Sequence, residues 1–552
     1  MIKQMLTTAI GILLSYGTII AQQPEIALSA GFADPGEEVC KLLLMENGST
    51  MFFHFSPKNG INTTVYDAEH KVVSTVNNQI SSFNASRLKN VFFRGMYDMN
   101  GQAVLFLVRY QRKSSTLYRF TFNGKTGKLA EEKIVDDVAR SPMILGIKGM
   151  PDYCVKKDPA SGYYAVASLN LNENYGKGQI KVTHYAPDHH VIHQATYTTP
   201  EQQFKYLRLK DMYVHGADYV FLTTLGINIS FPAHGKVFIT RISKEHDTVA
   251  EKYVELGKLL AEPLIGIKYN PANQLLYMLT AVGGRNPWQE SVMNSAEGGM
   301  LLKMHTVNPT TMEISPEASI THPALSTYAK ANLKYRDPYR GIIQDFRLHK
   351  DGSVTVMQEE LHISKDTSAR LDEGVEFSGA GSTTFGDIGI FRVNAEGKEL
   401  PGSYAIAKSQ HTHHWINPYL IYRRPEIAWN YYPAVHLAGV YNDNYCSYDY
   451  LEANDKSYIV YNDYPININR KTEDHRKKRL LQSLKPANTV LAWFDGEKVQ
   501  RMYLFGDPEG EHIAQYSRID MITRGAGDSS FVTLMVERKG SQREAHIAWV
   551  KL

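Results

Sequence analysis

Cysteine is scarce in this sequence: only Cys40, Cys154 and Cys446 occur among 552 residues. Three thiols cannot all pair, and no Cys-x-x-Cys spacing is present. The sequence therefore excludes a disulfide scaffold and gives no sign of a cysteine-based zinc module. We expect the three cysteines to be small buried side chains at the starts of strands.

Net charge is also small. Lys and Arg number 60 against 57 Asp and Glu, which leaves +3. Nucleic-acid-binding proteins usually carry a strongly basic domain, so no nucleic-acid partner is expected. Hydrophobic residues make up 43% of the chain and charged residues 21%, which is enough for a packed core and argues against bulk disorder.

The familiar enzyme motifs are missing as well. The chain has no Gly-x-Ser-x-Gly elbow, no Walker loop and no His-Glu-x-x-His pair. No cofactor is predicted, and the sequence does not name a reaction.

Long hydrophobic runs are absent after the first residues. Lys3 is followed by the mostly apolar Met5–Ile20, and polarity changes after Ala21. This layout predicts a signal peptide over residues 1–21 and an exported protein, periplasmic or extracellular. The alternative is an uncleaved anchor, but the run falls short of the roughly 20 residues that span a bilayer. No later transmembrane segment is predicted.

What the sequence does have is aromatic residues, with 34 Tyr, 21 Phe and 5 Trp, and a repeated pattern. The pattern is a strand-like run, a polar turn containing Gly, Asp or Asn, and a second strand-like run. Seven copies of this hairpin occur, at Asn62–Val76, Leu117–Val135, Gln179–Tyr197, Lys236–Leu256, Leu301–Ile320, Asp387–Ala407 and Thr489–Phe505.

Two further strand-like runs precede these hairpins, for example Ile342–His349 and Ser353–Glu359 before the sixth. The unit is thus four short strands in about 55–65 residues. A repeated four-stranded unit predicts an all-β fold, the β-propeller, because each sheet must pack on its neighbours to bury both faces. A two-sheet sandwich would not explain seven copies.

The C-terminus contributes a partial unit with three predicted strands, Arg518–Thr523, Phe531–Glu537 and Ala545–Val550. We expect Glu25–Ser29 to supply the fourth strand, so that the two ends of the chain share a blade. The prediction is one eight-bladed propeller over residues 22–552. Seven blades is the alternative, if the first unit folds differently.

Several short strings carry a resemblance to a known family. They are Gln344–Leu348, Lys350–Gly352, Gly386–Phe391, Ala395–Lys398, Ser409-Gln410 and Val460–Asp463. These strings resemble an uncharacterised family of exported proteins common in Bacteroidetes. The resemblance covers mainly residues 340–505 and implies an exported, propeller-like protein. It implies no catalytic residues, because the family has no assigned activity.

The insertions predict where a ligand binds. Residues 283–299, 362–386 and 465–488 lie between second and third strands, while 321–340 and 411–444 lie between blades. Both kinds of connection open on the same face of a propeller, and insertions gathered on one face often form the binding face. Neutral growth of surface loops is the alternative.

The segment 411–450 is rich in aromatic residues and suits a glycan- or peptide-binding surface, since flat rings stack on ligands at low entropic cost. The alternative is a plug that packs its own rings over the propeller mouth. The candidate ligand-binding residues are Trp415, Tyr419, Arg423, Arg424, Trp429, Tyr431 and Tyr432.

Three smaller features complete the candidates. His411, His413 and His414 are close in sequence, but in an extended segment they do not converge, so no metal site is predicted. Residues 471–484 predict a short helix capped by Thr472, whose basic run 476–479 is either a solvated face or a site for an anionic glycan or membrane surface. If the protein is an enzyme, the acid candidates are Asp443, Asp449 and Asp463.

The sequence thus favours a non-enzymatic binding or scaffold propeller of the cell envelope, with a glycan, a peptide or an envelope protein as partner. The alternative is a carbohydrate-active enzyme, a glycoside hydrolase or lyase with carboxylates near the central opening. Two carboxyls facing each other in an open pocket, one with a raised pKa, would favour the enzyme.

Overall fold

The computed structural model describes most of the chain after the first residues. The described residues are 23–36, 38–56, 60–82, 91–111, 114–139, 152–169, 180–198, 204, 206–228, 235–244, 246–257, 263–282, 301–365, 381–412, 447–454, 456–470, 474–508, 513–524 and 529–552. Among them, no helix is both long enough and apolar enough to cross a membrane.

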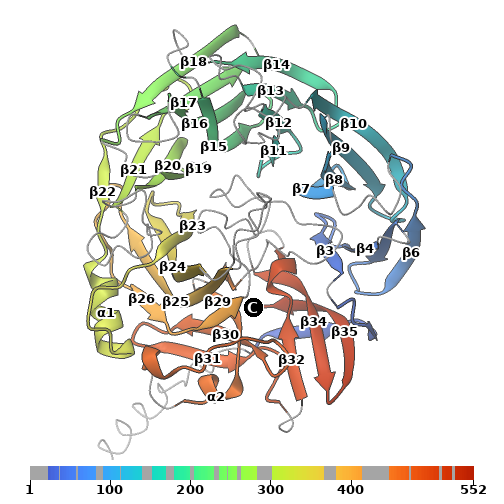
Figure 1. Ribbon diagram of the computed structural model, residues 1–552, viewed down its shortest axis with the longest axis vertical. Helices are drawn as coiled ribbons and strands as arrows, with labels where there is room; N and C mark the ends of the chain where they lie inside the picture. Colours follow the sequence, from blue (N-terminus) through green and yellow to red (C-terminus); the bar gives the residue numbers. More distant parts are fainter. Residues whose placement is uncertain are drawn as a thin grey trace, which may run out of the picture.

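The described strands form eight antiparallel sheets that stand around a common centre, which confirms the predicted eight-bladed β-propeller (Figure 1). Blade 1 consists of β3 (Val39–Leu44), β4 (Thr50–Ser56), β5 (Gly60–Tyr66) and β6 (Val72–Asn78), and blade 2 of β7 (Val91–Met99), β8 (Gln102–Tyr110), β9 (Ser114–Asn123) and β10 (Leu129–Ala139). Blade 3 consists of β11 (Asp152–Lys157), β12 (Tyr164–Leu169), β13 (Ile180–Tyr185) and β14 (Val191–Tyr197), and blade 4 of β15 (Tyr206–His215), β16 (Tyr219–Ile227), β17 (Lys236–Ser243) and β18 (His246–Val254).

Blade 5 consists of β19 (Leu264–Asn270), β20 (Leu275–Val282), β21 (Leu301–Val307) and β22 (Ala318–Ile320). Blade 6 consists of β23 (Ile342–Leu348), β24 (Val354–Lys365), β25 (Gly381–Val393) and β26 (Tyr404–Ile406), with β27 (Gln410–Thr412) paired to β25. Blade 7 consists of β28 (Tyr448–Ala453), β29 (Lys456–Asp463), β30 (Asn488–Phe494) and β31 (Val499–Tyr503). All seven predicted outer hairpins are the third and fourth strands of these blades.

The two-residue period of a strand explains how the blades pack. In β8, Ala103, Leu105 and Leu107 lie in the core between blades 1 and 2. The alternate residues Val104, Phe106 and Val108 lie in the core between blades 2 and 3. Because successive side chains point to opposite faces of a sheet, a middle strand must be apolar on both faces.

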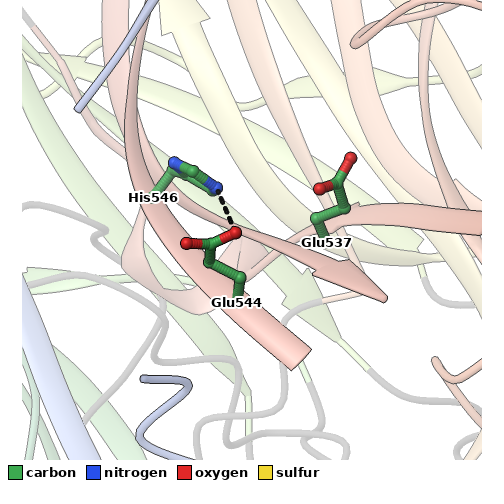
Figure 2. Close-up of side chains that lie close together, drawn as sticks. All are labelled: Glu537, Glu544 and His546. Carbon is green, nitrogen blue, oxygen red and sulfur yellow. Dashed lines mark ion pairs between the residues drawn. The ribbon is translucent and has the colours of Figure 1, made fainter. Parts of the chain in front are cut away.

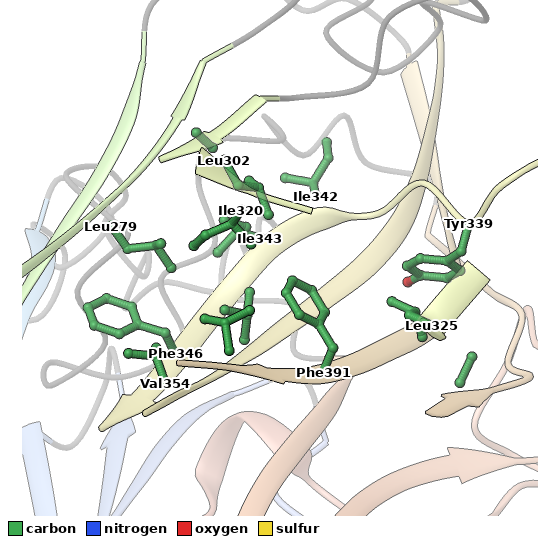
Figure 3. Packing of buried hydrophobic residues seen from close by; sticks show 14 of the residues in the cluster. Leu279, Leu302, Ile320, Leu325, Tyr339, Ile342, Ile343, Phe346, Val354 and Phe391 are labelled. Atoms are coloured by element: carbon green, nitrogen blue, oxygen red, sulfur yellow. The ribbon is translucent and has the colours of Figure 1, made fainter. Parts of the chain in front are cut away.

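Eight buried clusters repeat this arrangement around the ring, one at each junction between consecutive blades. Figure 3 shows the junction of blades 5 and 6, where Leu279 and Leu302 face Ile343, Phe346 and Phe391. Each blade is thus stabilised by two neighbours, as the repeat pattern required.

The closing blade is built from both ends of the chain. Its strands are β32 (Ile513–Ser517), β33 (Thr523–Arg524), β34 (Ser530–Lys539), β35 (Gln542–Lys551), β1 (Glu25–Leu28) and β2 (Phe32–Ala33). β1 pairs antiparallel with β35, from Glu25 opposite Lys551 to Leu28 opposite Ala548. This confirms the predicted shared blade.

One strand of the closing blade was predicted at the wrong place. The strand is Ile513–Ser517, and the predicted Arg518–Thr523 mostly forms a 3-10 turn at Ile519–Met521. Ile519 and Ile522 pack between blades 7 and 8, while Met521 packs between blades 8 and 1. Their apolar spacing therefore reflects a buried turn rather than a strand.

The described chain also corrects the helix prediction. Residues 474–484 do not form the predicted helix: a 3-10 turn covers only His475–Lys477, with Asp474 as its cap. Residues 471–473 of the prediction lie outside the described residues. The backbone groups of Arg479 and Leu481 instead form hydrogen bonds with residues elsewhere in the chain. The Asn467 side chain accepts from the Arg479 N–H and donates to the Arg479 carbonyl, and the Leu481 N–H donates to the Ser409 carbonyl. These tertiary hydrogen bonds replace helical ones.

Two helices do occur in the insertions, α1 (Pro323–Leu333) between blades 5 and 6, and the single turn α2 (Pro465–Ile468). α1 was not predicted. Its N-terminal N–H groups, those of Ala324 and Leu325, donate to the Glu399 carboxylate at 2.6 and 2.9 Å. An acceptor 75 residues away in sequence gives no local start signal.

Candidate functional site

The predicted aromatic site lies outside the described residues. This applies to Trp415, Tyr419, Arg423, Arg424, Trp429, Tyr431 and Tyr432, to the acid candidate Asp443, and to His413 and His414. The roles given to these residues from the sequence stay predictions.

The described ends of the insertions do meet. The His411 N–H donates to the Leu481 carbonyl at 2.8 Å, and Gln410 forms a parallel bridge to Leu481. The segment after blade 6 therefore lies against the insertion of blade 7, as a common face requires. The His411 imidazole lies 3.2 Å from the Thr384 hydroxyl.

The two described acid candidates have separate structural partners. Asp449 on β28 accepts from Arg524 of blade 8 at 2.6 Å. The buried Asp463 accepts from the Asn467 side chain and the Tyr464 N–H at 2.7 and 2.8 Å, and burial raises the pKa of its carboxyl. The contacts of these carboxyls hold blade 8 and the blade 7 insertion in place.

Three other carboxyls, which the sequence did not single out as site candidates, lie at the base of the insertions and make two separate sets of contacts. The first belongs to a buried ion pair: Lys408 Nζ lies 2.7 Å from Glu359 Oε1, and their side chains are 1% and 0% exposed. The Ser447 hydroxyl donates to the same Glu359 oxygen at 2.5 Å. Because the three residues come from β24, the end of blade 6 and the start of blade 7, the pair joins two blades.

The second set of contacts involves Glu360 and Asp387. They lie where the β24–β25 register shifts, with Glu359 opposite Ile388 and Leu361 opposite Phe385. This β-bulge turns Glu360 toward Asp387. The Asp387 N–H and the Tyr335 side chain are both hydrogen-bond partners of the Glu360 carboxyl. The Tyr335 hydroxyl also donates to Asp387 Oδ2 at 2.8 Å.

Burial and the negative charge of Asp387 raise the pKa of Glu360 to about 8. A carboxyl with this pKa holds its proton at neutral pH, as a general acid does. Gly386-Asp387 belongs to one of the strings that carry the family resemblance, but a sequence does not show which glutamate faces the aspartate.

A cavity among the described residues lies at the opposite ends of the same blades. It has a volume of about 890 Å³ and is lined by the turns between first and second strands of blades 6 and 7 and by the turn before β26. We call it the blade 6–7 cavity. The lining residues with acidic or basic side chains are Arg347, His349, Lys350, Arg392, Glu452 and Lys456.

Positive charge predominates in the blade 6–7 cavity, with four Lys or Arg side chains against the single carboxylate of Glu452. The Tyr450 hydroxyl donates to Glu452 at 2.6 Å. Arg392 lies 2.7 Å from Asp351, whereas no described carboxylate lies within ion-pair distance of Lys350 or Lys456. The pKa of His349 is lowered by burial, which keeps its imidazole neutral at pH 7.

Comparison with known proteins finds only distant similarities. No family model and no curated protein matches the chain. Among solved structures, polysaccharide lyase Uly1 is 10% identical, with a TM-score of 0.36 over 83% of this chain and 90% of that one. Prolyl oligopeptidase B from Galerina marginata is 7% identical, with a TM-score of 0.39 over 94% of this chain and 56% of that one.

The phage phi92 endosialidase is 10% identical, with a TM-score of 0.31 over 93% of this chain and 76% of that one. At these identities and TM-scores the similarities do not bear on function, so the blade topology itself carries the fold assignment.

Proposed function

We propose that this chain is a non-enzymatic binding propeller, exported to the cell envelope, that holds an anionic glycan in the blade 6–7 cavity. The observation that carries the proposal is the lining of that cavity, where Arg347, Lys350, Arg392 and Lys456 face a single carboxylate. Cationic side chains around a concave site attract carboxylate, sulfate or phosphate groups.

The polar character of the cavity favours a saccharide as the carrier of that charge. Thr355, Asn454 and Ser457 add hydroxyl and amide groups to the lining. The volume of about 890 Å³ falls within the range of about 300–1,000 Å³ that is typical of small-molecule sites. The two aromatic side chains, Phe391 and Tyr404, are buried in the wall, so charge and hydrogen bonds rather than stacking would give the affinity.

Export and family membership belong to the same proposal. Residues 1–21 have the layout of a signal peptide, and residues 340–505 resemble the exported Bacteroidetes family. The intact mass of protein extracted from the cell envelope tests the first point. We expect the mass of a chain that begins at Gln22, and a mass that includes Met1 would refute the cleavage.

An array of acidic and neutral glycans and peptides, probed with the full chain, tests the binding function. We expect acidic glycans to bind and their affinity to fall with ionic strength. The double variant Lys350→Gln/Lys456→Gln should lose roughly tenfold in affinity for an acidic glycan, about 1.4 kcal/mol.

Lys498→Gln is the matched control, because Lys498 is an exposed lysine in a turn of blade 7 on the same side that does not line the cavity. Equal affinity of the double variant and the wild type would refute the site. Preference for neutral glycans or peptides would refute the ligand class.

A second candidate function is that of a glycoside hydrolase or lyase. It is favoured by Glu360 and Asp387, which face each other, and by the raised pKa of Glu360. The two residues do not line the blade 6–7 cavity. Cleavage of a bound glycan by the wild type, lost in Glu360→Gln, would favour the enzyme over the binding protein.

A further inference from the structure

The closing blade contains a cluster of metal-ligating side chains that is separate from the cavity. Glu537 on β34 and Glu544 and His546 on β35 each have one ligand atom within 4.8 Å of those of the other two, and Figure 2 shows the three side chains near one another. We propose that these residues bind a divalent transition metal such as Zn²⁺, and that the ion strengthens the closure of the ring.

The hydrogen bond of His546 leaves one ring nitrogen for a metal. His546 Nδ1 lies 3.0 Å from the Ser29 carbonyl, which can only accept, so Nδ1 carries the proton. The neutral imidazole then has its lone pair on Nε2, the nitrogen that lies 3.8 Å from Glu544. A histidine that ligates a metal through one nitrogen commonly donates from the other to a carbonyl.

The two glutamates have different surroundings. Gln515 Nε2 donates to Glu537 Oε1 at 3.0 Å and orients that carboxylate from outside the cluster. The Glu544 carboxylate lies over Gly31, at a place that a Cβ on residue 31 would occupy. Glycine at position 31 therefore makes room for the third ligand.

The charges also call for a cation. Glu537 and Glu544 are directly opposite each other in the β34–β35 pair, an arrangement that is unfavourable for like charges. Lys539 Nζ lies 3.0 Å from Glu537, but its side chain is 60% exposed, so an entering metal would displace it at little cost.

Two carboxylates and one imidazole suit zinc, which takes nitrogen and oxygen ligands at about 2.0–2.2 Å and accepts water as a fourth ligand. Ligand atoms at those distances lie about 3.4 Å apart in a tetrahedron, so the three side chains need to close by about 1 Å or slightly more. Glu544, with 56% of its side chain exposed, is free to make most of that movement.

The place of the cluster in the fold gives the metal a role. His546 is tied to Ser29, next to β1, and Glu544 pairs with Ala33 of β2. A metal that joins β34 and β35 at these residues would hold the strands onto which the N-terminal segment is paired.

The test uses the untagged full chain, titrated with Zn²⁺ against a chromophoric chelator and melted with and without zinc. We expect one equivalent of zinc to bind and the melting temperature to rise by about 2 °C at zinc 100-fold above its Kd. Glu544→Gln and His546→Gln should each weaken zinc binding at least tenfold. Glu396→Gln, an exposed glutamate in a turn of blade 6, is the matched control and should bind as the wild type does.

Gly31→Ala extends the test to a residue that is not a ligand. The added Cβ displaces the Glu544 carboxylate, so the zinc affinity of the Gly31→Ala variant should fall. In a separate measurement, Co²⁺ added to the wild type should give the absorption spectrum of a low-symmetry site. The double variant His413→Gln/His414→Gln should keep full binding. No saturable binding, unchanged affinity in Glu544→Gln, or loss of binding in the His413/His414 variant would each overturn the proposal.

Discussion

The two ends of blades 6 and 7 use their charged residues in opposite ways. On the insertion side, Glu359 and Lys408 are completely buried and bonded to each other. On the cavity side, Asp351 and Arg392 remain 60% and 39% exposed. Long insertions add charged residues to one face of the propeller, but the charged residues near the base of these insertions become part of the packing between blades. Short turns leave theirs partly exposed, with Arg392 at the wall of the blade 6–7 cavity.

The largest effect is expected from Lys408→Met, which leaves the Glu359 carboxylate buried without its cation. Breaking a buried pair from one side costs about 3–5 kcal/mol. We expect a loss of that size in the free energy of unfolding, measured with urea. Lys350→Met on the cavity side should change it by less than about 0.5 kcal/mol.

Adding Glu359→Gln to Lys408→Met should restore much of that stability, because no buried charge remains. A Lys408→Met protein that unfolds like the wild type would mean that the insertion side is no more tightly packed than the cavity side.

A second experiment asks whether the insertion side binds ligand at all. If Trp415 and Trp429 are ligand anchors, Trp415→Ala and Trp429→Ala should each cost about 2 kcal/mol or more in binding, roughly thirtyfold in affinity, with little change in stability. If these side chains are buried, the loss should instead be about 3–5 kcal/mol of stability. Binding measured by calorimetry and melting measured by circular dichroism separate the outcomes.

Glu360→Gln sharpens the comparison through pH. Because the folded-state pKa of Glu360 is about 8, above that of an unfolded glutamate, its stabilising contribution is complete below about pH 4.5 and is lost as the pH rises through 8. The variant should therefore be more stable than the wild type at pH 9, by roughly 1–3 kcal/mol, and equal to it near pH 5.

Urea unfolding at the two pH values measures this difference. Asp463→Asn is a useful companion variant. Burial also raises the pKa of the Asp463 carboxyl, but no second carboxyl contributes to that rise. A wild type and a Glu360→Gln variant that keep the same stability difference at pH 5 and pH 9 would contradict the assignment.

The smallest effect is expected from Asp351→Asn on the cavity side. The hydrogen bonds from Ser353 and the nearby Arg392 lower the pKa of Asp351 to about 2, so its contribution is present above pH 4 and lost as the pH falls through 2. Since the carboxylate is largely exposed, the loss at pH 7 should stay below about 0.5 kcal/mol. A cost comparable to that of Lys408→Met would remove the contrast between the two sides.

The sequence predicted the insertion side of blades 6 and 7 only in part, and it named none of the residues that line the blade 6–7 cavity as ligand-binding. It placed the insertions of blades 6 and 7 on one face, and the contact between Gln410 and Leu481 agrees with that. It named Asp449 and Asp463 but passed over Glu359, Glu360 and Asp387. The facing of Glu360 and Asp387 depends on a bulge between strands, and the register of β24 and β25 is set by residues on both sides of an insertion.

Local pattern by itself determined the eight blades, the hairpins within them and the strand that closes the ring, because alternating apolar residues and polar turns act over a few neighbouring positions. Tertiary structure alone decided three other things. The first is the helix α1, whose first N–H groups donate to the distant Glu399. The second is the non-helical chain at 478–484, which is hydrogen-bonded to Asn467 and Ser409. The third is the proximity of Glu537, Glu544 and His546 beside Ser29. In each case the deciding partner lies far along the chain or on another strand, and only the closed ring brings the two together.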